Sequence, residues 1–341
     1  MAYTLAIVGA TGTVGREILN VLAERGFPHT DVTCLASRES VGTELSFGFD
    51  HTLKCKAVDH HDFSKTDVAL FVAGPEVAEK WVPVAAKAGC VAVDNSTFFR
   101  MQDSVPLVIP EANADALEGA MKRRIVASPS GIAAELAVVL KPLHDFGVAR
   151  RVVVDTYESV SEAGNAAMDE LFQQTRGIFV NDPIVTEEFP KQIAFNVIPH
   201  VDDFMQDGST REERRLAAET QKIVGADIKI AATCVRVPVF VGHSMAVHIE
   251  FEKEVSVSDA RRLLRAAPGC IVIDKREEGG YMTPVEAVGE FATFISRIRQ
   301  DKTVEHGLSL WVVSDNLRNA AALTAVQIAE IIAGRYLKKP N

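Results

Sequence analysis

YTLAIVGATGTVG, at residues 3–15, is the segment from which the fold of this chain follows most directly. Residues 3–8 form a short apolar run of strand type, and the REILNVLAERG after the glycines has the apolar spacing of a helix. A strand, a glycine turn and a helix in this order are typical of a loop that binds phosphate groups. Gly9 permits the tight turn, Gly12 lets backbone amides approach a pyrophosphate, and Gly15 lets the helix pack on the strand. The helix N-terminus adds free N–H groups and a positive dipole, both of which favour a phosphate. The alternative interpretation of this motif is a glycine turn with a structural role only.

The end of the second expected strand bears on which dinucleotide would bind. DVTCLAS at 31–37 is followed by Arg38, Glu39 and Ser40. NAD-binding folds usually carry an acidic residue at this point, which holds the ribose hydroxyls. A guanidinium beside the Ser37 hydroxyl suits a ribose 2′-phosphate better, so we expect NADP. Two alternatives stay open: Glu39 could take the acidic role for NAD, and Arg38 could be an ordinary solvated residue.

Strands and helices go on alternating through the first 130 residues. VALFVAG at 68–74 and CVAVDNSTFFRM at 90–101 are of strand type, and a helical pattern lies between them. The alternation predicts a parallel, doubly wound α/β sheet of the Rossmann type, with ligands bound at the carboxyl ends of its strands. The expected cofactor contacts at those ends are Gly9, Thr11, Gly12, Thr13, Val14, Gly15, Ser37, Arg38, Ser40, Ala73 and Gly74.

Size and composition bound the class of protein. A chain of 341 residues with 47% hydrophobic and 24% charged residues is expected to form two globular domains with sizeable cores. The formal net charge of -10 argues against a general nucleic-acid binder, and no apolar run is long enough to cross a membrane. No signal peptide is recognisable, and the 5 cysteines are scattered without metal-ligand spacing. We therefore expect a cytoplasmic protein without a metal site.

Longer motifs, in order over essentially the whole chain, resemble one enzyme family. They are DNSTFFRM at 94–101, VPLVIPEAN at 105–113, QIAFNVIPHVDDF at 192–204, TCVRVPVFVGHS at 233–244 and LWVVSDNLRNAAALTAVQIAE at 310–330. All are similar to segments of the aspartate-semialdehyde dehydrogenases. The resemblance implies NADP-dependent reduction of β-aspartyl phosphate to aspartate β-semialdehyde with release of phosphate, in the biosynthesis of lysine, methionine and threonine. It also implies a cysteine nucleophile, a histidine acid–base group and a homodimer or higher homo-oligomer.

The resemblance assigns roles to residues of this chain. Arg100 matches the arginine that binds the substrate phosphate, with Asn95 in the same loop, and Arg236 matches the arginine that binds the substrate carboxylate. His243 matches the catalytic histidine, and Asn316 matches the asparagine near the nicotinamide amide of the cofactor. The residues agree with these roles, because a phosphate and a carboxylate need two guanidinium groups. Arg236 lies in an apolar strand, where its burial requires a partner, either a ligand or a fixed protein carboxylate.

The chain departs from the family pattern where the chemistry takes place. ASPSGIAAELAVVLKPLH at 127–144 resembles the segment with the nucleophilic cysteine, but the cysteine position reads Gly131. Ser130 is one position away, and its hydroxyl would need a base to become a nucleophile. At three further site positions the chain differs from the family pattern: Glu158 stands where the family has a glutamine, Glu162 where it has a glycine, and Arg215 where it has a substrate-contacting lysine. Glu212 is the same residue as in the family pattern.

Three interpretations of these departures stay open. The leading one is an NADP-dependent oxidoreductase of this family that acts on a small, dianionic, aspartate-like substrate. The second is a paralogue that reduces another aspartate-derived carbonyl compound or imine without a covalent thioester. The third is a non-catalytic paralogue that still binds nucleotide. An engineered Gly131 is disfavoured, because Glu158, Glu162 and Arg215 differ as well.

Two domains are expected. Residues 1–130, completed by a C-terminal helix within 316–341, would bind the dinucleotide, and residues 131–315 would form an α+β domain for substrate binding and dimerisation. In this second domain the patterns predict a helix from about 131, antiparallel strands at 150–157, 227–240 and 244–252, and helices at 211–224 and within 161–190.

Overall fold

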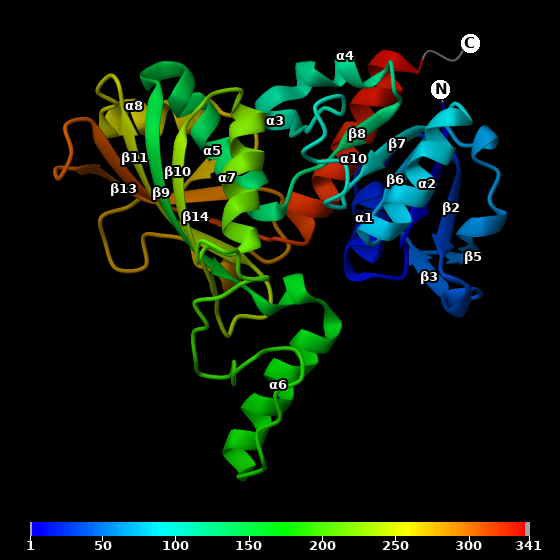
Figure 1. Cartoon of the computed structure of the whole chain (residues 1–341), viewed down its shortest axis with the longest axis horizontal. Coiled ribbons are helices and arrows are strands. Elements are labelled where there is room, and N and C mark those ends of the chain that lie inside the picture. The colour runs from blue at the N-terminus through cyan, green and yellow to red at the C-terminus, as the bar shows by residue number, and fades with distance from the viewer. Residues whose placement is uncertain (1, 338–341) are drawn as a thin grey trace. The chain divides into compact units, whose positions relative to one another are not determined.

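The structure is a computed structural model that describes residues 2–337 (Figure 1). Residue 1 and residues 338–341 lie outside the described part, and the latter belong to the C-terminal segment expected in the first domain. The chain divides into two compact units. One comprises the residues up to 130 together with those from 321 onward, and the other comprises residues 131–320. Each unit has its own six-stranded sheet.

The first unit is built on a parallel sheet with the strand order β5-β2-β1-β6-β7-β8. Its strands are β1 (Tyr3–Val8), β2 (His29–Ala36), β5 (Lys56–Ala57), β6 (Val68–Phe71), β7 (Val91–Asp94) and β8 (Ile125–Ala127). The strands β6, β7 and β8 are buried along their whole length, as parallel strands covered on both faces are. The chain runs outward from β1 in both directions, which confirms the predicted doubly wound α/β fold.

Helices of the first unit follow its strands. Helix α1 (Thr13–Glu24) buries one apolar face, and α2 (Pro75–Lys87) begins with a proline, which is favoured at a first helical position. The other elements of this unit are the hairpin β3 (Glu44–Phe47) and β4 (His51–Lys54), which the sequence did not indicate, and the short helices α3 (Pro110–Asn113) and α4 (Leu117–Ala120).

The C-terminal segment packs within the first unit. Helix α10 (Thr324–Ile331) is continued on both sides by π-helical turns. The hydroxyl of Tyr3 donates to the carbonyl of Ala333 at 2.6 Å, and Arg25 pairs with Glu330 at 2.7 Å. These contacts join the first strand and the end of α1 to residues more than 300 positions later in the chain.

The second unit is built on a mixed sheet with the strand order β10-β9-β11-β14-β13-β12. Its strands are β9 (Ala149–Glu158), β10 (Lys229–Arg236), β11 (His243–Phe251), β12 (Cys270–Val272), β13 (Thr293–Asp301) and β14 (Gly307–Ser314). The expectation of antiparallel strands is wrong for one pair, because β9 and β10 run parallel. The long connection between them contains helices, and such a crossover returns the chain in the same direction.

Three helices pack on this sheet: α5 (Gly131–Gly147), α7 (Arg211–Val224) and α8 (Val257–Ala266). Helix α5 is buried almost all round, so it lies in the core. Helix α7 has the bounds predicted from the sequence, since a capping box of Thr210 and Glu213 starts it and Gly225 ends it in the left-handed conformation. A further short helix is α9 (Pro284–Ala287).

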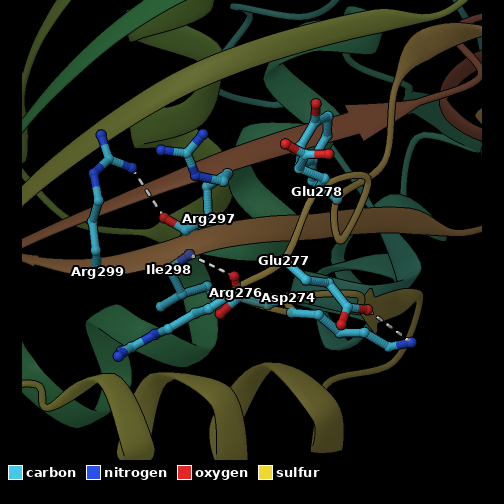
Figure 2. A pocket seen from close by; sticks show the side chains of 9 residues that line it. Asp274, Arg276, Glu277, Glu278, Arg297, Ile298 and Arg299 are labelled. Atoms are coloured by element: carbon cyan, nitrogen blue, oxygen red, sulfur yellow. Dashed lines mark hydrogen bonds and ion pairs between the residues drawn. The ribbon is translucent and has the colours of Figure 1, made fainter.

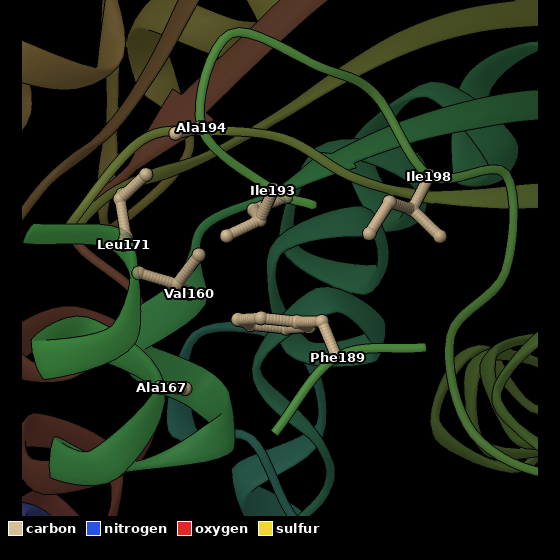
Figure 3. Packing of buried hydrophobic residues seen from close by; sticks show 7 residues of the cluster. All are labelled: Val160, Ala167, Leu171, Phe189, Ile193, Ala194 and Ile198. Carbon is tan, nitrogen blue, oxygen red and sulfur yellow. The ribbon is translucent and has the colours of Figure 1, made fainter. Parts of the chain in front are cut away.

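Helix α6 (Asn165–Val180) accounts for the helical character expected within 161–190. It projects from the rest of its unit in Figure 1 and is anchored at its start by a small apolar cluster, shown in Figure 3. The cluster consists of Val160, Ala167, Leu171, Phe189, Ile193, Ala194 and Ile198. The far end of α6 lacks such a core, and its large apolar side chains are exposed.

Candidate active site

The glycine turn of the first unit has the geometry of a phosphate-binding loop. Gly9 has φ +93°, and a Cβ there would lie 2.8 Å from the carbonyl oxygen of Val72, so no other residue fits without strain. A Cβ at Gly15 would clash with the backbone of Gly9 and Ala10. No side chain caps the N-terminus of α1 at Gly12. The backbone there can therefore offer N–H donors to a phosphate, and the turn fits a dinucleotide.

The residues after β2 do not by themselves decide between NAD and NADP. Arg38 and Ser40 bound a short 3₁₀ helix that directly follows Ser37. The side chain of Arg38 is 78% exposed and pairs with Asp59, at 2.5 Å for Nη2 and 2.7 Å for Nε. An exposed ion pair of this kind is weak because solvent screens it, so a phosphate could replace Asp59 at little cost. The pair is compatible with NADP and does not select it over NAD.

Asn95 and Arg100 lie together in the loop that follows β7. Arg100 is buried, and its Nη2 donates to the carbonyl oxygen of Asn95 at 2.7 Å. The loop is held by Asp94, whose carboxylate accepts from the backbone and hydroxyl of Ser96. Ala73 and Gly74 lie at the end of β6, where Gly74 is the residue before α2. These four predicted residues thus follow strands of the same sheet edge, as expected.

His243 lies at the start of β11 and is almost completely buried. Its Nδ1 accepts the backbone N–H of Ser159 at 3.0 Å, so in the neutral ring the proton is on Nε2. Nε2 faces the carboxylate of Glu162 at 3.8 Å. Burial lowers the pKa of His243 to about 4, although the charge of Glu162 acts in the opposite direction. At neutral pH the imidazole is therefore uncharged, with an N–H available for a substrate oxygen.

Asn316 fixes the backbone around this histidine. Its Oδ1 accepts the N–H of Gly242 at 2.8 Å, and its Nδ2 donates to the hydroxyl of Ser161 at 3.0 Å. Gly242 needs to be glycine, because its φ is +98° and a Cβ would lie 2.9 Å from the carbonyl oxygen of Pro284. The hydroxyl of Ser159 also donates to Asn316. Sequence reasoning missed Ser159 and Ser161, although they flank the already noted departures at 158 and 162.

Arg236 is held by protein carboxylates. Its Nη1 donates to Oε2 of Glu162 at 2.9 Å and to the carbonyl oxygen of Ser159 at 2.7 Å. Its Nη2 lies 3.7 Å from Oε2 of Glu158, which is the residue opposite Arg236 in the β9–β10 register. Of the two partners expected for this buried arginine, a ligand or a fixed carboxylate, the structure therefore contains the second.

The pKa values of the two carboxyl groups at Arg236 are shifted in opposite directions. Burial, together with the charge of Glu162, raises the pKa of Glu158 well above its usual range. Burial would raise the pKa of Glu162 too, but the charges of Arg236 and His243 and the hydrogen bonds from Glu158 and Arg236 outweigh it and lower that pKa. A proton shared by the two carboxyl groups is therefore held more strongly by Glu158 than by Glu162. The hydroxyl of Thr156 donates to Glu158 at 2.7 Å.

Glu212 and Arg215 lie on α7 and pair with each other. Arg215 also pairs with Asp202 at 2.7 Å, so two protein carboxylates already neutralise it. Glu212 is buried, and burial and the charge of Glu162 raise its pKa. The charge of Glu162 thus acts on Glu212 as well as on the residues around Arg236.

Gly131 is the first residue of α5. A Cβ there would lie 3.3 Å from the Cβ of Ala320, a tight contact that requires Ala320 to shift slightly, and 3.8 Å from the carbonyl oxygen of Asn316. Ser130 directly precedes it and is buried. Cys234, a thiol of the second unit on the same strand as Arg236, is a poor nucleophile, since burial raises its pKa and keeps it protonated.

Glu135, one turn after Gly131, was also missed. It is 1% exposed, and neither carboxyl oxygen has a hydrogen-bond partner among the described residues. Burial raises its pKa to about 8; the nearby hydroxyl of Ser314 acts in the opposite direction, and the charges of Asp315 and Glu162 add to the increase. A lone acidic residue in the apolar run IAAELAVVL was the signal that could have found it.

A separate pocket of about 910 Å³, shown in Figure 2, contains none of the predicted site residues. It is lined by Asp274, Lys275, Arg276, Glu277, Glu278, Tyr281, Arg297, Ile298 and Arg299. In Figure 2, Arg297 and Arg299 point to one side and Arg276 to another, so these guanidinium groups do not converge. Within residues 2–337, no three His, Cys, Asp or Glu side chains could hold a metal ion, and no helix could span a membrane.

Comparisons with known proteins agree with this architecture. Residues 4–120 match the family model for the NAD-binding domain of semialdehyde dehydrogenases, and residues 140–319 match the model for their dimerisation domain. Aspartate-semialdehyde dehydrogenase of Rickettsia bellii is 46% identical, over 98% of this chain and 99% of that protein. The Aquifex aeolicus enzyme of that name is 45% identical, over 97% of this chain and 98% of that protein.

A solved structure extends the likeness to three dimensions. The crystal structure of aspartate semialdehyde dehydrogenase II from Vibrio cholerae superposes with a TM-score of 0.96 at 40% identity, over 99% of this chain and 100% of that one. That enzyme has also been crystallised complexed with ASA. With both family models and these relatives covering nearly its whole length, the chain belongs to the aspartate-semialdehyde dehydrogenase family of oxidoreductases.

Proposed function

We propose that this chain is an NADP-linked oxidoreductase that reduces a small, aspartate-derived carbonyl compound directly, without a covalent thioester. The observation that carries the proposal is His243: an uncharged, buried imidazole with its Nδ1 fixed by Ser159 and its Nε2–H directed at Glu162. Position 131, where the family pattern has the nucleophile, offers no thiol. Family membership and the fit of the glycine turn to a dinucleotide support the cofactor part.

The residues around His243 are suited to this chemistry. The bound NADPH would supply a hydride to the carbonyl carbon. The Nε2–H of His243 would donate a hydrogen bond to the carbonyl oxygen as negative charge develops on it. The proton that completes the alcohol would come from Glu158, whose pKa is raised, by way of Glu162, whose carboxylate lies 3.8 Å from Nε2. Asn316 keeps Gly242 and Ser159 in place, so the imidazole cannot rotate away.

The proposed choice of NADP over NAD rests on the residues after β2. Ser37 and Arg38 favour the 2′-phosphate of NADP, and the exposed Asp59 pairing is weak enough to be exchanged. Arg100 and Asn95 are the proposed contacts for phosphate, should a phosphorylated compound be bound. We propose that the first unit binds the dinucleotide and the second unit binds the substrate.

A homodimer is the proposed assembly. Helix α6 and the chain after it expose large apolar side chains, among them Phe172 (53%), Phe179 (77%), Phe195 (65%) and Phe204 (65%). Phe179 and Phe195 also pack against each other edge to face. An apolar surface of this kind is typical of a protein–protein contact. It lies within the residues that match the dimerisation domain of the family.

The test is an assay with aspartate semialdehyde in two directions. Oxidation with NADP and phosphate is expected to be nearly absent, and consumption of NADPH by the aldehyde without phosphate is expected to be measurable. Gly131→Cys, which requires only a small shift of Ala320, is expected to restore little phosphate-dependent turnover, because Glu158 and Arg215 remain. Robust phosphate-dependent turnover by the unmodified chain would refute the proposal and point to Ser130. Nucleotide binding without turnover in either direction would leave a non-catalytic paralogue.

A further inference from the structure

We propose that Glu135 is a positioning residue of the active site. Only while its buried carboxyl carries a proton does the segment 314–320, which contains Asn316, stay packed on α5 and hold His243 in its working orientation. The inference deepens the proposed function and rests on it for the role of His243. It gives the site an upper pH limit that is set by a residue outside the reaction itself.

The first argument is that the surroundings of Glu135 suit the acid and not the carboxylate. Glu135 is 1% exposed, and neither of its carboxyl oxygens has a hydrogen-bond partner among the described residues. The nearby hydroxyl of Ser314 is completely buried and also lacks a partner in the described part of the chain. A carboxylate without a cation is far more costly to bury than the neutral acid. Glu135 is therefore held in its protonated form.

The second argument is that the charges around Glu135 do not compensate for ionisation. Asp315, directly after β14, and Glu162, in the turn after β9, are both acidic and disfavour a further negative charge. The guanidinium groups of Arg215 and Arg236 already pair with other carboxylates. The elements packed on α5 are β9, β11, α7 and α8, and the charged side chains of α8 are exposed or half-buried. The buried ionisable side chains of the other three elements are Glu158, Glu212, Glu219 and His243.

The third argument is that the segment 314–320 lies directly on the first turn of α5. A Cβ at Gly131 would be 3.8 Å from the carbonyl oxygen of Asn316. Asp315 gives the segment its shape, because its Oδ1 accepts two backbone N–H groups of the next residues, at 2.8 and 2.9 Å. Glu135 is one turn further along α5 and acts on Asp315 through its charge. Ionisation of Glu135 would therefore push this segment away from the helix.

Asn316 connects the segment to the histidine. Its Oδ1 accepts the N–H of Gly242 at 2.8 Å and the hydroxyl of Ser159 at 3.2 Å. The backbone N–H of Ser159 in turn donates to Nδ1 of His243 at 3.0 Å. If the segment moved, Asn316 would lose these contacts, and the imidazole would lose its fixed orientation.

The dependence on pH follows from the protonated form being the working one. The pKa of Glu135 is about 8, above its ordinary value of 4.5, so the arrangement is intact at neutral pH and is lost as the pH rises through 8. The pKa of Glu158 is also raised, and its ionisation would remove the proton that the proposed reaction needs. Activity alone would not separate the two residues, so the test needs a substitution and a second readout.

The experiment follows the ring of His243 by NMR of the full chain with isotope-labelled histidine, together with NADPH consumption. Loss of a signal in His243→Asn identifies the ring. In the parent, the Nδ1 signal should change with a midpoint near pH 8, and NADPH consumption should fall by about tenfold between pH 7 and pH 9. In Glu135→Gln the Nδ1 signal should stay constant over this range, and the activity ratio between pH 9 and pH 7 should be at least about fivefold higher than in the parent.

A second variant and a matched control test the assignment. Ser314→Ala keeps the carboxyl of Glu135, and because the Ser314 hydroxyl lowers the pKa of Glu135, its removal should move the midpoint to higher pH. Glu111→Gln removes a half-buried carboxyl of raised pKa from the first unit and should leave the midpoint unchanged. The other histidine signals show whether each variant is folded.

Three outcomes would overturn the inference. They are a His243 signal that stays constant to pH 9 in the parent, a signal that changes in Glu135→Gln as it does in the parent, and a midpoint that Ser314→Ala leaves in place. If Glu135→Gln does not fold, Ser314→Ala decides. The expected NMR result without NADPH consumption at any pH would contradict the proposed function and support the positioning role.

Discussion

The buried carboxyl of Glu135 gives a quantitative prediction about stability. Its pKa is about 8 in the folded chain, against an ordinary value of 4.5. Because the folded-state pKa is the higher one, the protonated carboxyl stabilises the fold fully below pH 4.5. This contribution is lost as the pH rises from 4.5 towards 8. At pH 7 the loss amounts to about 3.4 kcal/mol, at about 1.36 kcal/mol per pH unit.

Glu135→Gln removes the ionisable group but keeps its shape. The buried amide adds N–H donors that could lack partners, a cost of about 1–3 kcal/mol that does not depend on pH. The stability difference between variant and parent should therefore be read as a function of pH. Between pH 5 and pH 7 it should shift by about 2.5 kcal/mol in favour of Glu135→Gln.

Urea unfolding at pH 5, 6 and 7, followed by the fluorescence of Trp311 in the second unit, measures this shift. A Trp81→Phe background removes the signal from the first unit. Glu278→Gln, at an exposed position, is the control and should show no pH-dependent difference. If the difference between Glu135→Gln and its parent is the same at pH 5 and pH 7, Glu135 is ionised in the folded chain and the argument from burial is wrong.

Three further predictions concern cofactor, chemistry and assembly. Arg38→Ala should weaken NADP binding by about 1.5–3 kcal/mol, the value of a charge-assisted contact, and leave NAD unchanged in calorimetric titration; equal losses for both would contradict the choice of NADP. His243→Asn should abolish NADPH consumption but not NADPH binding. In the parent chain the same activity should rise as His243 loses its proton near pH 4 and be flat through neutrality, and a further rise at pH 6–7 would mean that the folded-state pKa is not lowered. Phe179→Asp should shift the chain from dimer towards monomer in analytical ultracentrifugation, while an Asp at the exposed Phe49 of the first unit should not; a persistent Phe179→Asp dimer would place the contact elsewhere.

Local features were the ones that sequence patterns predicted well. The glycines at 9 and 15 have backbone environments that exclude any side chain, so their roles followed from spacing alone. Helix α7 was predicted at its observed bounds, because its cap residues Thr210 and Gly225 are sequence signals. The hairpin of β3 and β4 was missed, since two strands of four residues carry too little periodicity to be recognised.

Arg236 shows most clearly what the sequence determined by itself and what it left to the tertiary structure. An arginine in an apolar strand predicts a charged partner, and the motif around it identifies the family. The partner's identity was decided only by tertiary structure. β9 and β10 pair parallel through a crossover of some seventy residues, and that register brings Glu158 opposite Arg236 and Glu162 against it. Strand pairing depends on contacts distant in sequence, so no local pattern could show that the chain's own carboxylates hold this guanidinium.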